Sequence, residues 1–193
     1  MKVRDSGMPD ETYWESLFDI ESIMQRIGPA KHAIDAVEFG SGYGTFSLPI
    51  ARRISGTLFA LDLETELIHR LKQRAESQNV NNITAIERDF VASGTGLADA
   101  SVDYACLFNI LHHDEPVNLI REAKRVVRPG GFLAVMHWRS DLSTPRGPSL
   151  DIRPKPQQML AWLHEAEVTS AVYYVLAPYH YGYLAKITTG DRI

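Results

Sequence analysis

The sequence predicts an α/β protein with a doubly wound, seven-stranded, mostly parallel sheet. Short apolar runs typical of buried strands alternate with amphipathic helical segments along most of the 193 residues. A glycine-rich turn joins the first of these strands to the helix that follows it. Such alternation gives βαβ units, which form a parallel sheet with helices on both faces. The length and the 45% hydrophobic content suit one domain with a packed core.

Each expected strand is a short apolar run bounded by turn residues. The last two runs are joined by a short turn at residues 177–180, so we expect them to form an antiparallel pair. The expected strands cover residues 33–39, 57–63, 83–87, 102–108, 132–138, 168–176 and 181–188.

Apolar residues at helical spacing predict the helices. A leading amphipathic helix is expected from Asp10, a plausible N-cap, to the break at Gly28. A helix over residues 115–127 should end before Pro129 and Gly130, because proline cannot continue a helix and glycine favours a C-cap. The remaining helices are expected near residues 46–54, 67–75 and 159–163.

Composition excludes several classes of protein. The formal net charge is -4, which argues against a surface built to bind nucleic acid. Cys106 is the only cysteine, so the chain can form neither an internal disulfide nor a thiolate metal cage. No apolar run approaches the roughly 20 residues of a membrane span, and residues 1–10 lack the apolar core of a signal peptide. We therefore expect a soluble cytoplasmic protein.

The glycine-rich turn is the feature that narrows function most. Gly40, Gly42 and Gly44 allow a sharp bend and a close approach of the backbone to a ligand. A dinucleotide fingerprint would need its third glycine at position 45, where this chain has Thr45. Glu38 precedes the turn, and its carboxylate would repel a pyrophosphate but suits a ligand with an ammonium group. The pattern therefore disfavours NAD.

Acids at the ends of the next two strands strengthen this interpretation. Asp62 ends the second strand, where a carboxylate can accept hydrogen bonds from a ribose diol. The alternative is that Asp62 caps the following helix. Asp89 ends the third strand and precedes Phe90, so this pair would face an adenine edge. Together these residues indicate a nucleoside site.

The ordered motifs resemble those of the class I S-adenosylmethionine-dependent methyltransferases. The resemblance is greatest to the small enzymes related to the ubiquinone/menaquinone-biosynthesis methyltransferases, and it spans residues 33–138. The motifs that carry it are E-x-G-x-G-x-G at 38–44, the acid Asp62, Arg88-Asp89-Phe90, Val102-Asp103-Tyr104 leading to Asn109-Ile110-Leu111-His112-His113, and Arg128-Pro129-Gly130-Gly131.

The resemblance implies a Rossmann-like sheet with strand order 3-2-1-4-5-7-6 and an antiparallel strand 7. It also implies S-adenosylmethionine as the cofactor and S-adenosylhomocysteine as the product. The turn would hold the methionine portion, Asp62 the ribose, and the residues after the third strand the adenine. The residues expected to bind the cofactor are Glu38, Gly40, Ser41, Gly42, Gly44, Asp62, Leu63, Asp89, Phe90, Asn109 and Ile110.

Two departures from the family pattern concern the first and third strands. Residues 89–98 replace the usual acid-x-x-x-Leu-Pro segment, so the adenine wall is expected to be looser. Asp35 stands in the first strand where an aliphatic residue is commoner.

We divide the single domain, residues 1–193, into four parts. Residues 1–30 would form the N-terminal helix and residues 33–138 the cofactor-binding core. Residues 139–157 hold four of the ten prolines and would form a substrate-binding loop or, alternatively, a solvated linker. Residues 158–193 would form the last helix and the antiparallel strand pair.

Methyl transfer from a sulfonium is an in-line displacement that depends mainly on proximity and desolvation. An acceptor that carries a proton also needs a base, and His112 and His113 lie at the carboxyl end of the fourth strand. Asp114 is better explained as a helix cap. No metal site is expected, because adjacent histidines seldom bind one ion. An acceptor pocket is expected from Tyr13, Trp14, His137, Trp138, Arg146 and His180, although ordinary packing is an alternative for each.

The sequence thus predicts S-adenosylmethionine-dependent methyl transfer to a small-molecule acceptor, with neither nucleic acid nor membrane as a partner. A non-catalytic or regulatory protein that binds S-adenosylmethionine or S-adenosylhomocysteine is the alternative, and an NAD-dependent oxidoreductase ranks third. Whether the protein is a monomer or a homodimer stays open, as does the acceptor atom.

Overall fold

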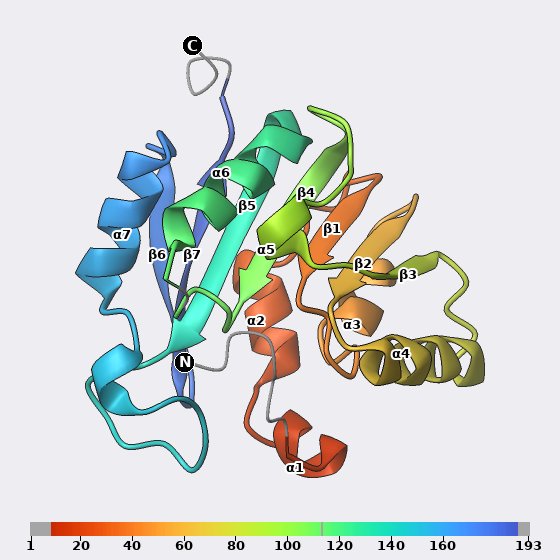
Figure 1. Ribbon diagram of the computed structural model, residues 1–193, viewed down its shortest axis with the longest axis horizontal. Helices are drawn as coiled ribbons and strands as arrows, with labels where there is room; N and C mark the ends of the chain where they lie inside the picture. The colour runs from red at the N-terminus through yellow and green to blue at the C-terminus, as the bar shows by residue number, and fades with distance from the viewer. Residues whose placement is uncertain (1–8, 113, 189–193) are drawn as a thin grey trace.

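A computed structural model describes residues 9–112 and 114–188 and shows a seven-stranded sheet (Figure 1). Its order is β3-β2-β1-β4-β5-β7-β6, and β7 is antiparallel to both of its neighbours while the other pairs are parallel. This confirms the predicted fold class and strand order. The strands are β1 (Ala36–Phe39), β2 (Leu58–Asp62), β3 (Ile83–Glu87), β4 (Val102–Phe108), β5 (Val127–Trp138), β6 (Ala171–Leu176) and β7 (His180–Lys186).

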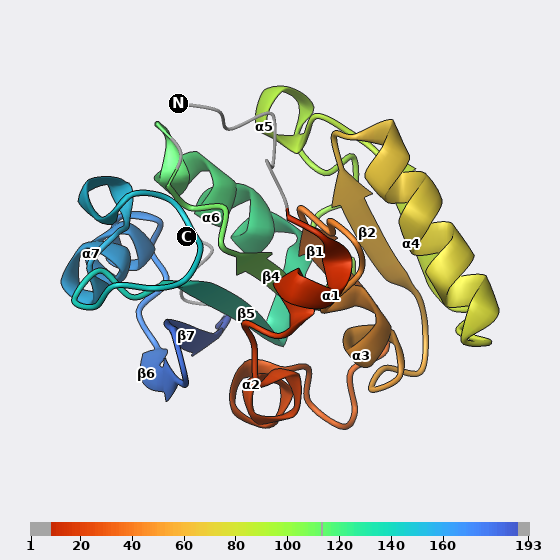
Figure 2. The ribbon, with the colours of Figure 1, turned by 90° about the horizontal axis from the view of Figure 1, so that it is seen from below.

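Helices cover both faces of the sheet, as βαβ connections require. α2, α3 and α4 pack on one face, and α6 and α7 pack on the other (Figures 1 and 2). The helices are α1 (Glu11–Glu15), α2 (Ile20–Ile27), α3 (Ser47–Ala51), α4 (Thr65–Ser77), α5 (Phe90–Ser93), α6 (Pro116–Val126) and α7 (Pro156–Glu165), with a short 3₁₀ helix, η1 (Leu150–Ile152). No helix in the described ranges has the length and apolar character needed to cross a bilayer.

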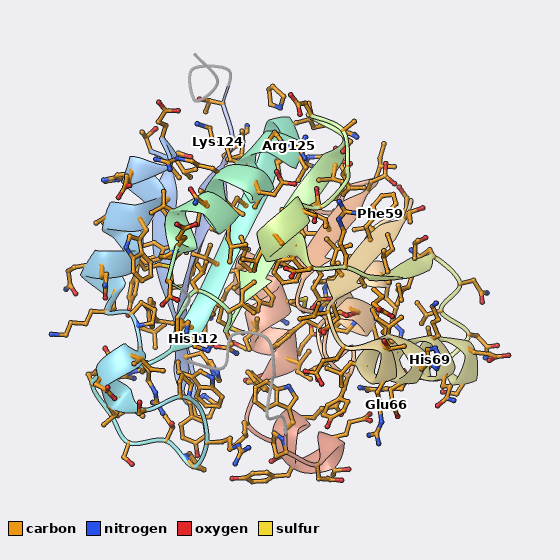
Figure 3. The ribbon with its side chains drawn as sticks, viewed as in Figure 1. Phe59, Glu66, His69, His112, Lys124 and Arg125 are labelled. Carbon is orange, nitrogen blue, oxygen red and sulfur yellow. The ribbon has the colours of Figure 1, made fainter. Side chains whose placement is uncertain are left out.

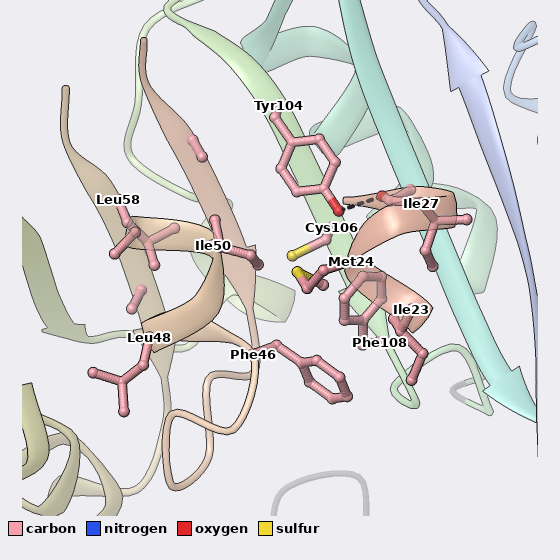
Figure 4. Packing of buried hydrophobic residues seen from close by; sticks show 14 of the residues in the cluster. Ile23, Met24, Ile27, Phe46, Leu48, Ile50, Leu58, Tyr104, Cys106 and Phe108 are labelled. Carbon is pink, nitrogen blue, oxygen red and sulfur yellow. Dashed lines mark hydrogen bonds between the residues drawn. The ribbon is translucent and has the colours of Figure 1, made fainter. Parts of the chain in front are cut away.

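Two apolar clusters, one on each face, make up the core. Side chains along a strand alternate between the faces, so Tyr104 and Cys106 of β4 join one cluster while Ala105 and Leu107 join the other. Figure 4 shows the first cluster, where α2 packs against β4. There the Tyr104 hydroxyl donates a hydrogen bond of 2.8 Å to the carbonyl of Ile27, which ties the end of α2 to the sheet.

The expected leading helix is two helices. Asp10 caps α1 as predicted, accepting from the backbone N–H of Thr12 at 3.0 Å. A second cap follows, because the Asp19 carboxylate accepts from the N–H of Ser22 at 3.1 Å and starts α2. Between them, residues 17–18 turn their apolar side chains into the core. The hydrophobic spacing concealed this break because half-buried Trp14 of α1 packs against the same core cluster as the buried Met24 and Ile27 of α2.

The segment around Pro129 also departs from expectation. α6 ends at Val126, and β5 begins directly at Val127 and runs through the Pro-Gly-Gly sequence. Gly130 donates its N–H to the Ile187 carbonyl at 2.7 Å. Gly130 therefore continues the sheet and does not cap a helix, since backbone pairing with the C-terminal segment satisfies its polar groups. The one-turn helix α5, capped by Asp89, was not predicted.

The carboxyl ends of the parallel strands share one edge of the sheet, which Figure 2 views from below. α1 crosses this edge in front of β1 and β4, and the long segment between β5 and α7 runs beside the end of β5. The strand-end residues predicted to bind a ligand all belong to this edge, where open α/β sheets bind their ligands.

Candidate cofactor and catalytic site

The glycine turn between β1 and α3 is held against β2. The N–H groups of Gly40 and Ser41 both donate to the carbonyl of Leu61, at 2.8 and 2.9 Å. Gly40 has φ +74°, and a Cβ there would lie 3.1 Å from the Cγ2 atom of Ile110. At Gly44, with φ +82°, a Cβ would lie 2.5 Å from Leu71 Cδ1. Only glycine fits these two positions without strain, so the turn brings bare backbone close to the sheet edge.

Asp62 joins the turn to the start of α4. Its Oδ2 atom accepts from the N–H of Gly42 at 2.8 Å, and its Oδ1 atom accepts from the N–H of Glu64 at 3.1 Å. Burial raises the pKa of Asp62, and these N–H donors oppose that shift. The N-cap residue of α4 is Glu64, so Asp62 braces two backbone segments and is not the helix cap itself. Its carboxylate has lone pairs beyond these two bonds. Leu63 follows it in sequence and is half-buried.

Glu38 lies in β1 and is only 2% exposed. Burial, together with the nearby charge of Asp62, raises its pKa to about 8 against the effect of a hydrogen bond from the Ser47 hydroxyl. At neutral pH its carboxyl group is therefore mostly protonated. Pairing with a ligand ammonium group would require this proton to leave. Ser47 was not predicted to belong to the site, and its position at the start of α3 was the available signal.

Three polar side chains near the turn have buried atoms that find no hydrogen-bond partner among residues 9–112 and 114–188. They are the hydroxyl groups of Ser41 and Thr45 and both polar atoms of the Asn109 side chain. Asn109 follows β4 with φ +61°, and its N–H donates to the carbonyl of Met136 at 2.8 Å. Buried polar groups are nearly always paired, so each exception needs an explanation. A ligand with amino-acid and hydroxyl groups would supply the missing partners, which fits S-adenosylmethionine.

The residues expected beside the adenine lie at the end of β3. The Asp89 side chain accepts from the N–H of Ala92 at 3.0 Å as the cap of α5. Phe90 meets Phe39 edge-on, with ring centroids 5.4 Å apart. Arg88 donates to the carbonyl of Gly94 at 2.6 Å and so folds the chain after α5 back toward β3. The segment that departs from the family pattern thus has its own internal hydrogen bonds.

His112 lies beyond β4, at the carboxyl edge (Figure 3). Its Nδ1 atom is 3.2 Å from the Nε2 atom of His137, and the two rings meet nearly perpendicular. His137 belongs to β5 and is fully buried. Burial is the main cause that holds the pKa of His137 well below its usual value, and the neighbouring His112 lowers it further. His113, the other predicted base, lies outside the described residues.

The predicted acceptor pocket divides into buried and exposed residues. Trp138 and His180 are buried in an aromatic cluster, with ring centroids 4.2 Å apart, and Trp14 lies at its edge, 6.1 Å from Trp138. Neither ring nitrogen of His180 has a hydrogen-bond partner among the described residues. Burial lowers the pKa of His180 to about 3, and the positive charge of Arg153 contributes to this shift. Tyr13 and Arg146 are exposed.

Arg153 was missed by sequence reasoning. It is 6% exposed and donates to the carbonyls of Pro148 at 2.8 Å and Arg139 at 2.9 Å, and to the Thr144 hydroxyl at 2.8 Å. Its guanidinium carbon lies 5.8 Å from the centre of the Trp138 ring. Arg153 thus fastens the segment after β5 over the aromatic cluster. No periodic pattern marks such a residue, because most of its partners are backbone carbonyls.

The described ranges contain no group of three histidine, cysteine, aspartate or glutamate side chains placed to hold a metal ion. Cys106 is buried in the core.

Comparison with known proteins supports this description. Residues 36–131 match the family described as methyltransferase domain. A solved S-adenosylmethionine-dependent methyltransferase from Aquifex aeolicus superimposes with a TM-score of 0.80 at 21% identity, covering 93% of this chain and 94% of that one. At this identity the structural likeness establishes the fold.

Two curated relatives match this chain over only part of their own length. An uncharacterized 37.1 kDa protein in a Streptomyces fradiae transposon is 29% identical over 162 residues, covering 78% of this chain and 46% of the relative. The tRNA 5-carboxymethoxyuridine methyltransferase of Escherichia coli K12 is 24% identical over 123 residues, covering 63% and 46%. The chain spans about half the length of these relatives. The family match and the shared fold support the expectations of a methyltransferase domain and of S-adenosylmethionine as its cofactor.

Proposed function

We propose that this chain, whose residues 36–131 belong to the methyltransferase-domain family and whose fold is that of the class I S-adenosylmethionine-dependent enzymes, methylates a small-molecule acceptor. The observation that carries the proposal is the set of buried, unpartnered polar atoms of Ser41, Thr45 and Asn109 around the glycine turn. Within the described part of the chain they lack hydrogen-bond partners, and they match the hydrogen-bonding groups of the cofactor.

In this proposal the chain holds the cofactor along the carboxyl edge of the sheet. The turn and Asn109 would contact the methionine portion, with Glu38 as the partner of its ammonium group. Asp62 would accept from the ribose hydroxyls while it keeps the N–H of Gly42. Leu63, Asp89, Phe90 and Ile110 complete the proposed cofactor site.

When bound, S-adenosylmethionine would supply an activated methyl group. The acceptor's lone pair would form the new bond to the methyl carbon as the carbon–sulfur bond breaks, and the electron pair of the broken bond would stay on sulfur. The chain aligns the acceptor and excludes water, and alignment alone can contribute on the order of 7–11 kcal/mol. His112 would take the proton of an acceptor that carries one. His113 keeps its place in the proposal as a second candidate base.

We propose a small acceptor because α1 and the segment that Arg153 fastens both lie at this edge of the sheet. Tyr13, Trp14 and Trp138 would wall this region, with His137, Arg146 and His180 nearby. Within the family we keep the narrower likeness to the ubiquinone/menaquinone-biosynthesis group as part of the proposal. The net charge of -4 supports an acceptor other than nucleic acid, and it is consistent with a cytoplasmic protein.

Two alternatives follow from specific observations. The Escherichia coli relative is named for a tRNA substrate, so tRNA is the competing acceptor. A non-catalytic binding protein is less favoured, because the family match is to a methyltransferase domain.

Calorimetric titration tests the cofactor. We expect micromolar binding of S-adenosylmethionine and S-adenosylhomocysteine and no binding of NAD. Asp62→Ala should weaken binding of S-adenosylmethionine by about 1.5–3 kcal/mol, roughly 10- to 150-fold, the range for hydrogen bonds to a charged group. Unchanged affinity in that variant would refute the ribose role.

Release of S-adenosylhomocysteine, measured across a library of small acceptors and with unmodified tRNA, then tests the acceptor. Turnover with a small molecule supports the proposal. Turnover with tRNA alone replaces it by the alternative.

A further inference from the structure

The contact between His112 and His137 links the loop after β4 to the end of β5. Their Nδ1 and Nε2 atoms are 3.2 Å apart. The remaining ring nitrogen of His137, Nδ1, lies 3.4 Å from the carbonyl oxygen of Trp138. Three groups therefore stand in a row: the Trp138 carbonyl, the His137 ring and the His112 ring.

The chemistry of this row fixes where the protons are. A carbonyl oxygen can only accept, so the Nδ1 atom of His137 carries a hydrogen. A neutral imidazole has one N–H, which leaves a lone pair on the Nε2 atom of His137. His112 must then donate from its Nδ1 atom, and its own lone pair is on Nε2. The opposite assignment would set the His137 lone pair against the lone pairs of the Trp138 carbonyl.

The surroundings keep His137 neutral, as this assignment requires. It is fully buried in β5, and among the described residues the charged or titratable groups that face it are His112, His180 and Arg153. None of these is an acid, and each lowers the pKa of His137 further after burial itself. A protonated His137 would also turn its Nε2 atom into a donor and break the row.

We propose that His137 is a positioning residue that holds His112 in its Nδ1–H form, so that the Nε2 atom of His112 receives the acceptor's proton. This inference rests on the proposed methyl transfer and adds to it the class of acceptor. A base held in this form serves an acceptor that still carries its proton, such as a hydroxyl or amine. An ionised carboxylate needs no base.

The proposed step balances in atoms and charge. His112 Nε2 takes the proton from the acceptor's O–H or N–H bond, whose electron pair remains on the acceptor atom. That atom forms a bond to the methyl carbon, and the carbon–sulfur bond breaks with its pair on sulfur. The imidazolium formed at His112 then loses its proton to water, which restores the starting state.

Nuclear magnetic resonance of the ligand-free protein, labelled with ¹⁵N at histidine, reads the tautomers directly. We expect long-range ¹H–¹⁵N correlations to show His112 and His137 both protonated at Nδ1 near neutral pH. The variant His137→Phe removes the acceptor, and His112 should then change tautomer. His137→Gln, which offers an amide acceptor in place of Nε2, should restore the Nδ1–H form of His112.

The exposed His69 of α4 supplies the matched control, because it lies away from His112 (Figure 3). His69→Gln should leave the signals of His112 and His137 unchanged. A wild-type His112 protonated at Nε2, or a His112 tautomer unaffected by both His137 variants, overturns the inference. If His137→Phe does not fold, the wild-type spectrum and His137→Gln still decide.

This measurement uses neither cofactor nor acceptor, so it separates the two proposals. Failure to bind S-adenosylmethionine would remove the proposed function and leave the tautomer result standing. With an acceptor identified, His137→Phe should lower kcat at least tenfold while KM for S-adenosylmethionine stays unchanged. An equal kcat in the wild type and His137→Phe would refute the positioning role.

Discussion

Thr45 carries a buried hydroxyl group that meets no partner in the described chain, although the residue is only 4% exposed. An unpaired buried hydroxyl costs about 1–3 kcal/mol of folding free energy. The group is therefore expensive in the free protein and useful only when a ligand completes it. This opposition between stability and binding distinguishes a ligand contact from a packing residue.

Thr45→Val tests this opposition because valine has nearly the same shape and no hydroxyl. We expect the variant to raise the free energy of unfolding by about 1 kcal/mol and to weaken binding of S-adenosylmethionine severalfold. Chemical denaturation and calorimetric titration measure the two effects. Thr84→Val, at an exposed position in β3, is the control and should change neither. A Thr45→Val protein that is less stable and binds equally well would show an ordinary packing role.

Glu38→Gln tests the proton on the buried carboxyl group. Because its pKa is raised to about 8, the group is protonated in the free protein at pH 7. An ammonium group beside it would stabilise the carboxylate, so binding of S-adenosylmethionine should release a proton, and affinity should rise as pH approaches 8. Titrations in buffers with different ionisation enthalpies measure this release.

In Glu38→Gln the release should vanish and affinity should fall. Glu21→Gln removes an exposed carboxyl whose pKa is lowered by its bond to Arg53, and it should leave the release unchanged. Equal proton release in Glu38→Gln and the wild type would contradict the proposed ammonium contact.

The residues of the turn and the strand-end acids could be predicted because their chemistry follows from position in a βαβ unit. Glu38 and Asp62 sit where the sequence places them, at adjacent strand ends. Their partners could not be predicted, since the bond from Ser47 to Glu38 and the burial of Asn109 depend on how separate loops meet. His137 was expected near an acceptor, and its contact with His112 depends on the register between β4 and β5.

At the scale of elements, strands were easier to predict than helix ends. β3 and β4 match their expected ranges because turn residues bound each apolar run. β5 begins five residues earlier than expected, at Val127 and not at 132, because backbone pairing with residues near Ile187 outweighs the turn preference of Pro-Gly-Gly. Local sequence carries no information about that distant partner. Tertiary pairing therefore explains this difference.

The segment between β5 and α7 depends on Arg153. Its guanidinium group satisfies carbonyls at two points of the segment, those of Arg139 and Pro148. Arg153→Met would leave these acceptors without a donor, at a cost of about 1–3 kcal/mol if they stay buried. We expect the segment to open instead, since water can then satisfy them.

Limited proteolysis followed by mass spectrometry measures this opening. Arg153→Met should be cleaved within residues 139–152 faster than the wild type, with a lower Tm. Arg153→Lys should fall between them, because an ammonium group lacks the planar fork that reaches several acceptors. Lys155→Met, an exposed change in the same segment, is the control. Equal cleavage of Arg153→Met and wild type would show that Arg153 does not fasten the segment.

For the whole molecule, burial of ionisable groups makes stability depend on pH in two opposed ways. Glu38 has its pKa raised from 4.5 to about 8, so the folded state binds more protons between these values, and the free energy of unfolding falls as pH rises through them. His137 and His180 have lowered pKa values, so the unfolded state binds more protons below pH 6.5. Their contribution to stability is lost as pH falls. Burial of Glu38 therefore lowers the stability toward alkaline pH, and burial of His137 and His180 lowers it toward acid pH.

His180→Phe tests the acid limit, because phenylalanine fits between Phe18 and Trp138, whose rings lie 4.6 and 4.2 Å from the His180 ring, and carries no proton. The wild-type pKa moves from 6.5 unfolded to about 3 folded. As pH falls from 6.5 to 4, the free energy of unfolding of the wild type should therefore fall by about 3 kcal/mol more than that of the variant. Urea denaturation across this range measures the difference.

The variant His180→Phe should also be more stable at pH 7, where it removes two ring nitrogens that have no partner among the described residues. His164→Phe, at an exposed position of α7, should follow the wild-type curve. Parallel curves for His180→Phe and the wild type would mean that the imidazole finds a partner or water in solution, and the aromatic cluster would then be open enough to admit an acceptor.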